Sequence, residues 1–117
     1  MYKDFKDMKV WQDGIDIAVI IFTLTEALPK KEDYGFTSQI RRSALSISAN
    51  IAEAFGRHHK NDKVNFYYYA RGSVTETRSH LEYGKRVGYI SNEQQIDLEN
   101  RLKETYFELN KIIKTIK

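Results

Sequence analysis

The stretch QIRRSALSISANIAEAFGR, residues 39–57, predicts a helix because it contains no proline and its one glycine comes next to its end. At about 100° per residue, its polar side chains fall within an arc of roughly 80°. This polar row consists of Gln39, Arg42, Ser46, Asn50, Glu53 and Arg57. The apolar face that we expect to join the core consists of Ile40, Ala44, Ile47, Ile51 and Phe55.

The same helix has almost no ordinary solvent-exposed face. Residues 36–56 carry only three charged side chains. A further uncharged sector of this helix contains Leu45, Ala49, Ala52 and Gly56. A helix on the surface of a lone bundle normally keeps one charge-rich face toward water. We infer that a second copy of the chain covers this sector, because the other helices of one bundle shield only the core face.

Apolar residues recur at spacings of three and four in other segments, which predicts three more helices. We expect these helices at about residues 8–28, 62–87 and 91–117. Pro29 ends the first of them, because proline is unsuited to a helix interior. Gly88 is a natural C-terminal cap of the next. Ser91 and Gln94 have the spacing of a capping box at the start of the last helix.

Short segments, at about residues 29–35, 57–61 and 88–91, connect the predicted helices. Short connections make successive helices antiparallel neighbours, so we expect an all-α, up-down-up-down four-helix bundle. The whole chain, residues 1–117, has the length of one domain with one core.

The composition narrows the compartment in which we expect the protein. The chain has no cysteine, so disulfides and thiolate metal sites are excluded and a reducing compartment is the simpler expectation. The charged start, MYKDFKDMKVW, lacks the apolar core of a signal peptide. The longest apolar run, residues 17–22, falls far short of the roughly 20 residues that a membrane span needs. We expect a cytoplasmic protein that does not enter membranes.

Two interpretations of the polar row stay open. In the first, the row stabilises one packing arrangement, with Arg42 and Glu53 partly buried and matched by polar residues of the next helix. The candidate partners on that helix are Arg71, Ser73 and Glu76. In the second, the row binds phosphate or a small polar ligand. Both interpretations can hold at an oligomer interface.

Positive charge is concentrated in the middle of the chain. The net charge is +3, and residues 34–88 carry the whole positive excess. Five of their basic residues cluster at the second connection and form what we call the basic rim: Arg57, His58, His59, Lys60 and Lys63. Arg41 and Arg71 are further candidates for contact with RNA or DNA. The alternative is a solvated loop with ordinary surface charge.

Four aromatic residues in succession, FYYY at residues 66–69, point in four directions on a helix. We expect Phe66 and Tyr69 in the core, so that Tyr67 or Tyr68 lies elsewhere. A ring outside the core is suited to a contact between subunits, because tyrosine is enriched at protein interfaces. Stacking on a nucleic-acid base is the alternative.

Three segments carry a resemblance to a known family: DMKVWQ (7–12), YGFTSQIRRSALSISANIAEAFGR (34–57) and FYYYARGSVTE (66–76). They resemble the four-helix-bundle family encoded in intervening sequences of bacterial 23S ribosomal RNA genes. That family is similar to the accessory variability protein of diversity-generating retroelements, a homopentamer with a basic surface that engages nucleic acid and a reverse transcriptase. The resemblance implies a ring of five subunits. Ala54 replaces a usual glycine of the family, and Thr77 replaces a larger apolar residue.

The sequence offers little for catalysis or metal binding. His58 and His59 are adjacent and therefore diverge on a helix, and His80 has no ligand partner four residues later. No nucleophile with an oriented base and no glycine-rich phosphate loop is evident. We therefore expect a non-enzymatic homo-oligomer, without metal or cofactor, that binds RNA or DNA through a basic rim. The alternative is an oligomeric scaffold that binds a protein partner and makes no nucleic-acid contact.

Overall fold

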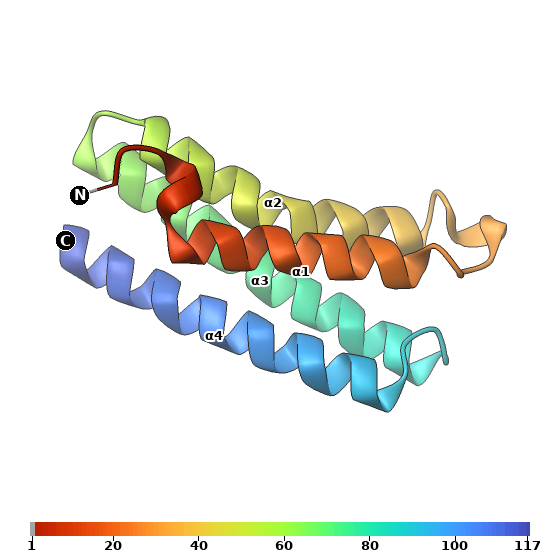
Figure 1. Ribbon diagram of the computed structural model, residues 1–117. Helices are drawn as coiled ribbons and strands as arrows, with labels where there is room; N and C mark the ends of the chain where they lie inside the picture. Colours follow the sequence, from red (N-terminus) through yellow and green to blue (C-terminus); the bar gives the residue numbers. More distant parts are fainter. Residues whose placement is uncertain (1) are drawn as a thin grey trace.

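The computed structural model describes residues 2–117. Their helices are η1 (Phe5–Asp7), α1 (Lys9–Thr25), η2 (Lys30–Glu32), α2 (Phe36–Gly56), α3 (Lys60–Arg86) and α4 (Asn92–Ile116). Successive long helices reverse direction, so both chain ends and the α2–α3 connection lie at one end of the molecule (Figure 1). The other end carries η2 and the α3–α4 connection. The expected all-α arrangement with four long helices is confirmed.

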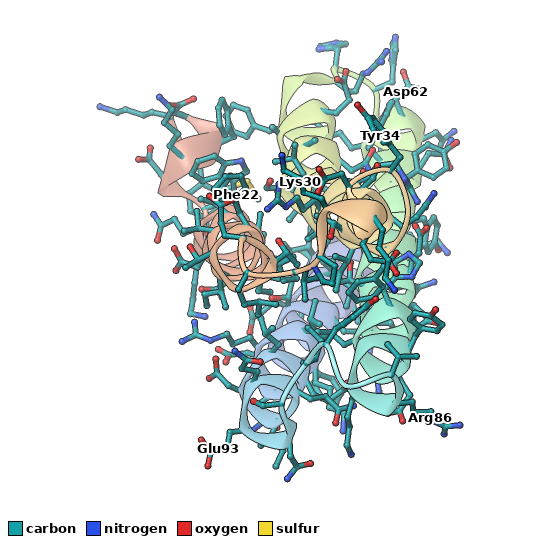
Figure 2. All side chains as sticks on the ribbon, turned by 90° about the vertical axis from the view of Figure 1, so that its right-hand side faces the viewer. Phe22, Lys30, Tyr34, Asp62, Arg86 and Glu93 are labelled. Carbon is teal, nitrogen blue, oxygen red and sulfur yellow. The ribbon has the colours of Figure 1, made fainter. Side chains whose placement is uncertain are left out.

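Viewed along the helices, the bundle places α1, α2, α3 and α4 at successive corners (Figure 2). The contact between α2 and α3 is the most extensive, and that between α1 and α4 is the least extensive. The α2–α3 pair therefore provides the main helix–helix contact of the bundle, and α1 and α4 pack against each other least. None of the helices within residues 2–117 combines the length and apolarity needed to cross a membrane.

Local signals explain where the helices begin and end. The Ser91 hydroxyl accepts a hydrogen bond from the Gln94 amide at 3.1 Å, and the Gln94 side chain accepts one from the Ser91 amide at 2.9 Å, which confirms the capping box. Gly88 follows α3 with a φ of +86°, the left-handed conformation that favours glycine. The first helix ends at Thr25 rather than at residue 28, and the Glu26 and Leu28 amides donate to the Thr23 and Thr25 carbonyls in tighter turns before Pro29.

The core forms where the apolar faces of the helices meet. In α2, four of the five expected core residues are fully buried: Ile40, Ala44, Ile47 and Ile51. Phe55 is only partly buried at the edge of this core. The Thr77 hydroxyl lies 2.9 Å from Ser43 Oγ and 2.8 Å from the Ser73 carbonyl oxygen. A polar residue at position 77 is therefore accommodated by a buried hydrogen-bonded pair between α2 and α3.

The expectation that Tyr69 belongs to the core is wrong. Tyr67 is buried at 4% exposure, whereas Tyr69 is 57% exposed. The buried side of α3 runs through Val64, Tyr67, Ala70 and Val74, at the spacing of three and four that one helix face requires. Tyr69 falls outside this face, and Phe66 lies at its margin, partly buried.

Candidate functional site

The polar row lies along the outside of the α2–α3 contact, and part of it is linked across that contact. Arg42 forms an ion pair and hydrogen bond with Glu76 of α3. Arg42 Nη2 also lies 3.5 Å from Gln39 Oε1, and the Glu76 carboxylate lies 3.5 Å from His80 Nε2. The Arg42 and Glu76 side chains are about half exposed, so we place this pair among surface ion pairs of roughly 0–1 kcal/mol.

The rest of the polar row finds its partners within α2 or at the residue that follows it. Ser46 Oγ donates to the Arg42 carbonyl at 2.8 Å, and the Asn50 side-chain amide donates to the Ser46 carbonyl at 2.8 Å. Glu53 lies 3.1 Å from Arg57, the residue that directly follows α2. The expectation that Glu53 meets a partner on α3 is therefore wrong, because its side chain faces outward, beside Arg57.

The other expected α3 partners of the row also differ from the prediction. The Ser73 side chain makes no hydrogen bond to the row within the described residues, and its carbonyl accepts from Thr77. Arg71 points to the opposite side of α3, where its Nη1 donates to Asn110 of α4 at 2.9 Å. Arg71 also lies over the Tyr68 ring, with 4.9 Å between its Cζ and the ring centroid. Among residues 2–117, Glu76 is the one expected α3 partner that pairs with the polar row.

The basic rim occupies the end of the bundle that also holds both chain ends (Figure 1). His58, His59 and Lys60 are exposed. Their side chains form no ion pair or hydrogen bond with residues 2–117, and the two imidazole rings stack edge to face at 5.1 Å. These three side chains are therefore available to a ligand.

The other two rim residues already have intramolecular contacts. Lys63 Nζ donates to the Ala54 and Phe55 carbonyl oxygens, each at 3.1 Å, at the C-terminal end of α2. Both carbonyls belong to the last turn of α2, and the Ala54 carbonyl also accepts from the Arg57 amide at 3.2 Å, so Lys63 adds a side-chain cap to this helix end. Arg57 pairs with Glu53, and its Cζ lies 4.7 Å from the centroid of the Phe66 ring. The rim thus divides into three available side chains and two with structural contacts.

The two remaining nucleic-acid candidates lie away from the rim. Arg41 is near the start of α2, and at 1.5 Å per residue it lies about 24 Å along the helix from Arg57. Its Nε donates to Thr25 Oγ1 at 2.8 Å, and its Cζ lies 4.4 Å from the Phe22 ring centroid. Arg71 faces α4. Within one chain, the seven predicted basic residues therefore do not form one continuous surface.

The uncharged sector of α2 is open in the single chain, and we call it the open face. Leu45 is 57% exposed, Ala49 is exposed and Ala52 is partly exposed. A Cβ placed on Gly56 meets no atom within 4 Å. On the neighbouring α1, Phe22 is 50% exposed beside Arg41.

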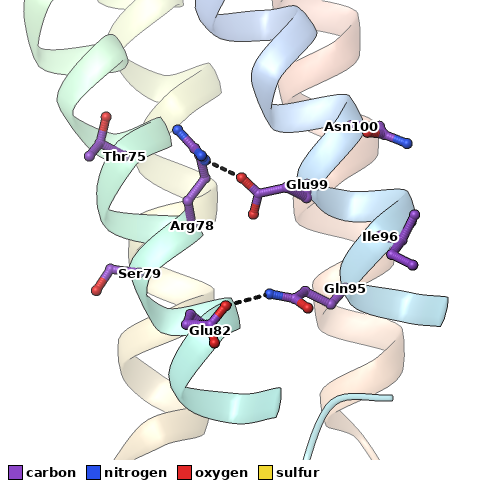
Figure 3. Close-up of a pocket in the computed structure, with 8 residues that line it drawn as sticks. All are labelled: Thr75, Arg78, Ser79, Glu82, Gln95, Ile96, Glu99 and Asn100. Atoms are coloured by element: carbon purple, nitrogen blue, oxygen red, sulfur yellow. Dashed lines mark hydrogen bonds and ion pairs between the residues drawn. The ribbon is translucent and has the colours of Figure 1, made fainter. Parts of the chain in front are cut away.

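A groove of about 550 Å³, lined mostly by polar residues, lies between α3 and α4 (Figure 3). Arg78 and Glu99 form an ion pair across it, and Gln95 donates to Glu82 at 2.8 Å. Hydrogen bonds from Arg86 and Gln95 hold the pKa of Glu82 below its ordinary value. The charged side chains of the groove are paired with side chains of α3 or α4, so the groove offers no unpaired charge to a ligand.

The geometry of the described residues does not support metal binding. No three His, Asp or Glu side chains within residues 2–117 gather as a metal site. His80 Nε2 is buried, with the Glu76 carboxylate as its neighbour at 3.5 Å. That the chain is not an enzyme stays a prediction.

Comparison with known proteins agrees with this architecture. The sequence model of the family described as "23S rRNA-intervening sequence protein" matches residues 6–111. The chain is also similar to the crystal structure of a protein with unknown function from the S23 ribosomal protein family of Bacteroides thetaiotaomicron. That similarity has a TM-score of 0.80 and 30% sequence identity, and it covers 90% of this chain and 98% of the other. No protein of curated function matches. Since the family match includes α1, α2, α3 and most of α4, the chain belongs to the 23S rRNA-intervening sequence protein family.

Proposed function

We propose that this protein is a non-enzymatic homo-oligomer that contacts RNA or DNA through its basic rim. The observation that carries the proposal is the open face of α2, where Leu45 is 57% exposed among small uncharged residues. Exposed apolar surface of this kind is typical of protein contacts, and small side chains allow two helices to approach closely. The pentameric ring follows from the family resemblance and is part of the proposal.

A ring requires two different faces to meet at each contact, because only head-to-tail contacts close into a cycle. The open face, together with Phe22 of α1, supplies one of these faces. Ring formation also places one copy of the basic rim from each subunit around the same end. Weak phosphate contacts by His58, His59 and Lys60 then add together, since they act at a high effective concentration.

Assembly is tested by introducing a charge into the open face. Leu45→Glu buries a carboxylate at the proposed contact, so we expect it to release monomers in sedimentation equilibrium at tens of micromolar chain. Ile96→Glu is the matched control, because Ile96 is 53% exposed on the outer side of α4. We expect this control to keep the wild-type mass. A wild-type protein that sediments as a monomer contradicts the proposed assembly.

Nucleic-acid contact is tested at the available rim residues. The double variant His58→Glu/Lys60→Glu adds negative charge to the rim without touching the Lys63 cap, and Lys30→Glu/Lys31→Glu is its control at the opposite end of the bundle. We expect only the rim variant to weaken binding of a labelled single-stranded RNA and DNA in fluorescence anisotropy. Each lost phosphate contact lowers the slope of log affinity against log salt by about 0.7.

An equal loss of binding affinity in both variants, or no binding by the wild type at low salt, contradicts rim contact.

One observation favours the alternative, a scaffold that binds a protein partner: Arg57 and Lys63 are already engaged within the chain. An assembled ring that binds neither RNA nor DNA supports this alternative. Genomic position within a ribosomal RNA operon does not distinguish the two functions.

A further inference from the structure

A second candidate site lies at the end of the bundle where α1 begins. Lys9 Nζ, at the first residue of α1, lies 2.9 Å from Glu104 Oε1, which sets the start of α1 level with Glu104. Helix α4 continues to Ile116, so at 1.5 Å per residue it runs about 18 Å past this point. Helix α3 packs along this part of α4, with hydrogen bonds from Arg71 to Asn110 and from Lys117 to Tyr68, whereas α1 does not extend along it.

The mismatch in length leaves a cavity of about 460 Å³ between α1, α3 and α4. This is within the range of volumes that small-molecule sites have, roughly 300–1,000 Å³. Its apolar lining consists of Met8, Val10, Phe55, Ile112 and Ile116. Tyr2 and Tyr67 also line it. The cavity is therefore mainly apolar.

Tyr67 is the polar group that this lining leaves without a partner. The residue lines the cavity and is more than nine-tenths buried, and its hydroxyl makes no hydrogen bond to any of residues 2–117. Buried phenol groups ordinarily have a hydrogen-bond partner. Burial, with a smaller contribution from Tyr2, raises the pKa of Tyr67, so its hydroxyl stays neutral and can both donate and accept.

The charged groups around the cavity are already paired. Lys63 caps α2, and Lys9 lies between Asp13, at 2.6 Å, and Glu104. Glu108 lies 3.5 Å from Lys111. An ionic ligand would have to displace one of these contacts, whereas a neutral ligand would not. The cavity is therefore suited to a neutral molecule.

We propose that this cavity binds a neutral, mostly apolar small molecule whose single hydrogen-bonding group reaches the Tyr67 hydroxyl. The apolar lining supplies the contact area, and the phenol supplies orientation, as is usual in small-molecule sites. This site includes no residue of the open face and none of the three available rim residues, and it shares with the basic rim only Lys63, which caps α2. Its test therefore does not depend on assembly or on nucleic-acid binding.

The test uses three probes of nearly equal size: naphthol, naphthalene and the anion naphthoate. Binding is measured on the full-length protein by calorimetry and by NMR shifts of the Ile112 and Ile116 methyl groups. We expect naphthol to bind most tightly, with a dissociation constant below about 1 mM. Tyr67→Phe removes only the hydroxyl, and we expect it to weaken naphthol about 2- to 12-fold, the factor that one hydrogen bond contributes. Naphthalene affinity stays unchanged.

Tyr69→Phe is the matched control, because it removes an exposed hydroxyl from the same helix. We expect wild-type affinity for all probes. Tyr67→Phe also leaves the unfolding midpoint unchanged or raises it, since the lost hydroxyl had no partner in the empty protein. The proposal is overturned if naphthol does not bind, if naphthoate binds more tightly than naphthol, or if the two Phe variants behave alike.

Discussion

Gly84 in the last turn of α3 has no room for a side chain. A Cβ placed there lies 2.6 Å from Ile90 Cγ1 and 2.7 Å from Phe36 Cζ. Ile90 and Phe36 are both buried, so neither can move away into solvent. Gly84→Ala therefore forces the contact between the α3–α4 connection and the start of α2 to shift.

The loss of unfolding free energy caused by the clash can be separated from the effect of helix propensity. Overpacking by one methyl group costs about 1–3 kcal/mol of unfolding free energy. Alanine offsets this by up to about 1 kcal/mol, because it favours the helix more than glycine does. Gly72 lies in the same helix, and a Cβ placed there meets no atom within 4 Å. Gly72→Ala has only the propensity gain, so we expect Gly84→Ala to be less stable than Gly72→Ala by about 1–3 kcal/mol.

Urea unfolding followed by far-ultraviolet circular dichroism measures this difference. All proteins are compared at one chain concentration, because assembly would couple stability to concentration. We expect the midpoint to change while the slope stays the same, since the variants expose equal surface on unfolding. Equal stability of Gly84→Ala and Gly72→Ala would refute the close packing around Gly84.

Two further predictions concern single polar contacts. Lys63→Met keeps the apolar stem but removes the cap of α2, so we expect urea unfolding to show that the free energy of unfolding falls by about 0.5–1.5 kcal/mol. Lys60→Met is the control and should leave the free energy of unfolding unchanged, because Lys60 makes no such contacts. The Phe36 amide and the Tyr89 hydroxyl donate to Glu32 and lower its pKa. A lowered folded-state pKa gives stability that is present above the unfolded pKa and lost as pH falls through the folded one. In urea unfolding at a series of pH values, the free energy of unfolding of Glu32→Gln should therefore fall less steeply at acid pH than that of the wild type. The same fall in both proteins would contradict this contact.

The core face of α2 and the capping box of α4 were predictable because each depends on a repeat or spacing within one segment. Ile40 and Ile47 share a helix face whatever packs against them. Ser91 and Gln94 satisfy each other's backbone amides without help from another helix. The succession of helices followed from the same local information.

The contacts between elements were less predictable. Helical spacing places Tyr67 and Tyr69 on different sides of α3, but which side is buried depends on where α1, α2 and α4 pack. The interpretation of Lys63 as a rim cation missed its contact with the α2 carbonyls, because that contact depends on how the chain turns between α2 and α3. The cavity beside Tyr67 had no sequence signal at all.

The sequence alone determined the helices of this protein, their order and the residues that line the core, since hydrophobic periodicity and capping act within a few turns of one segment. The tertiary structure decided which polar side chains meet, which basic residues remain available and where α4 extends past α1. These features depend on the register of one helix against another. That register is set by the packing of the whole bundle, and no single segment encodes it.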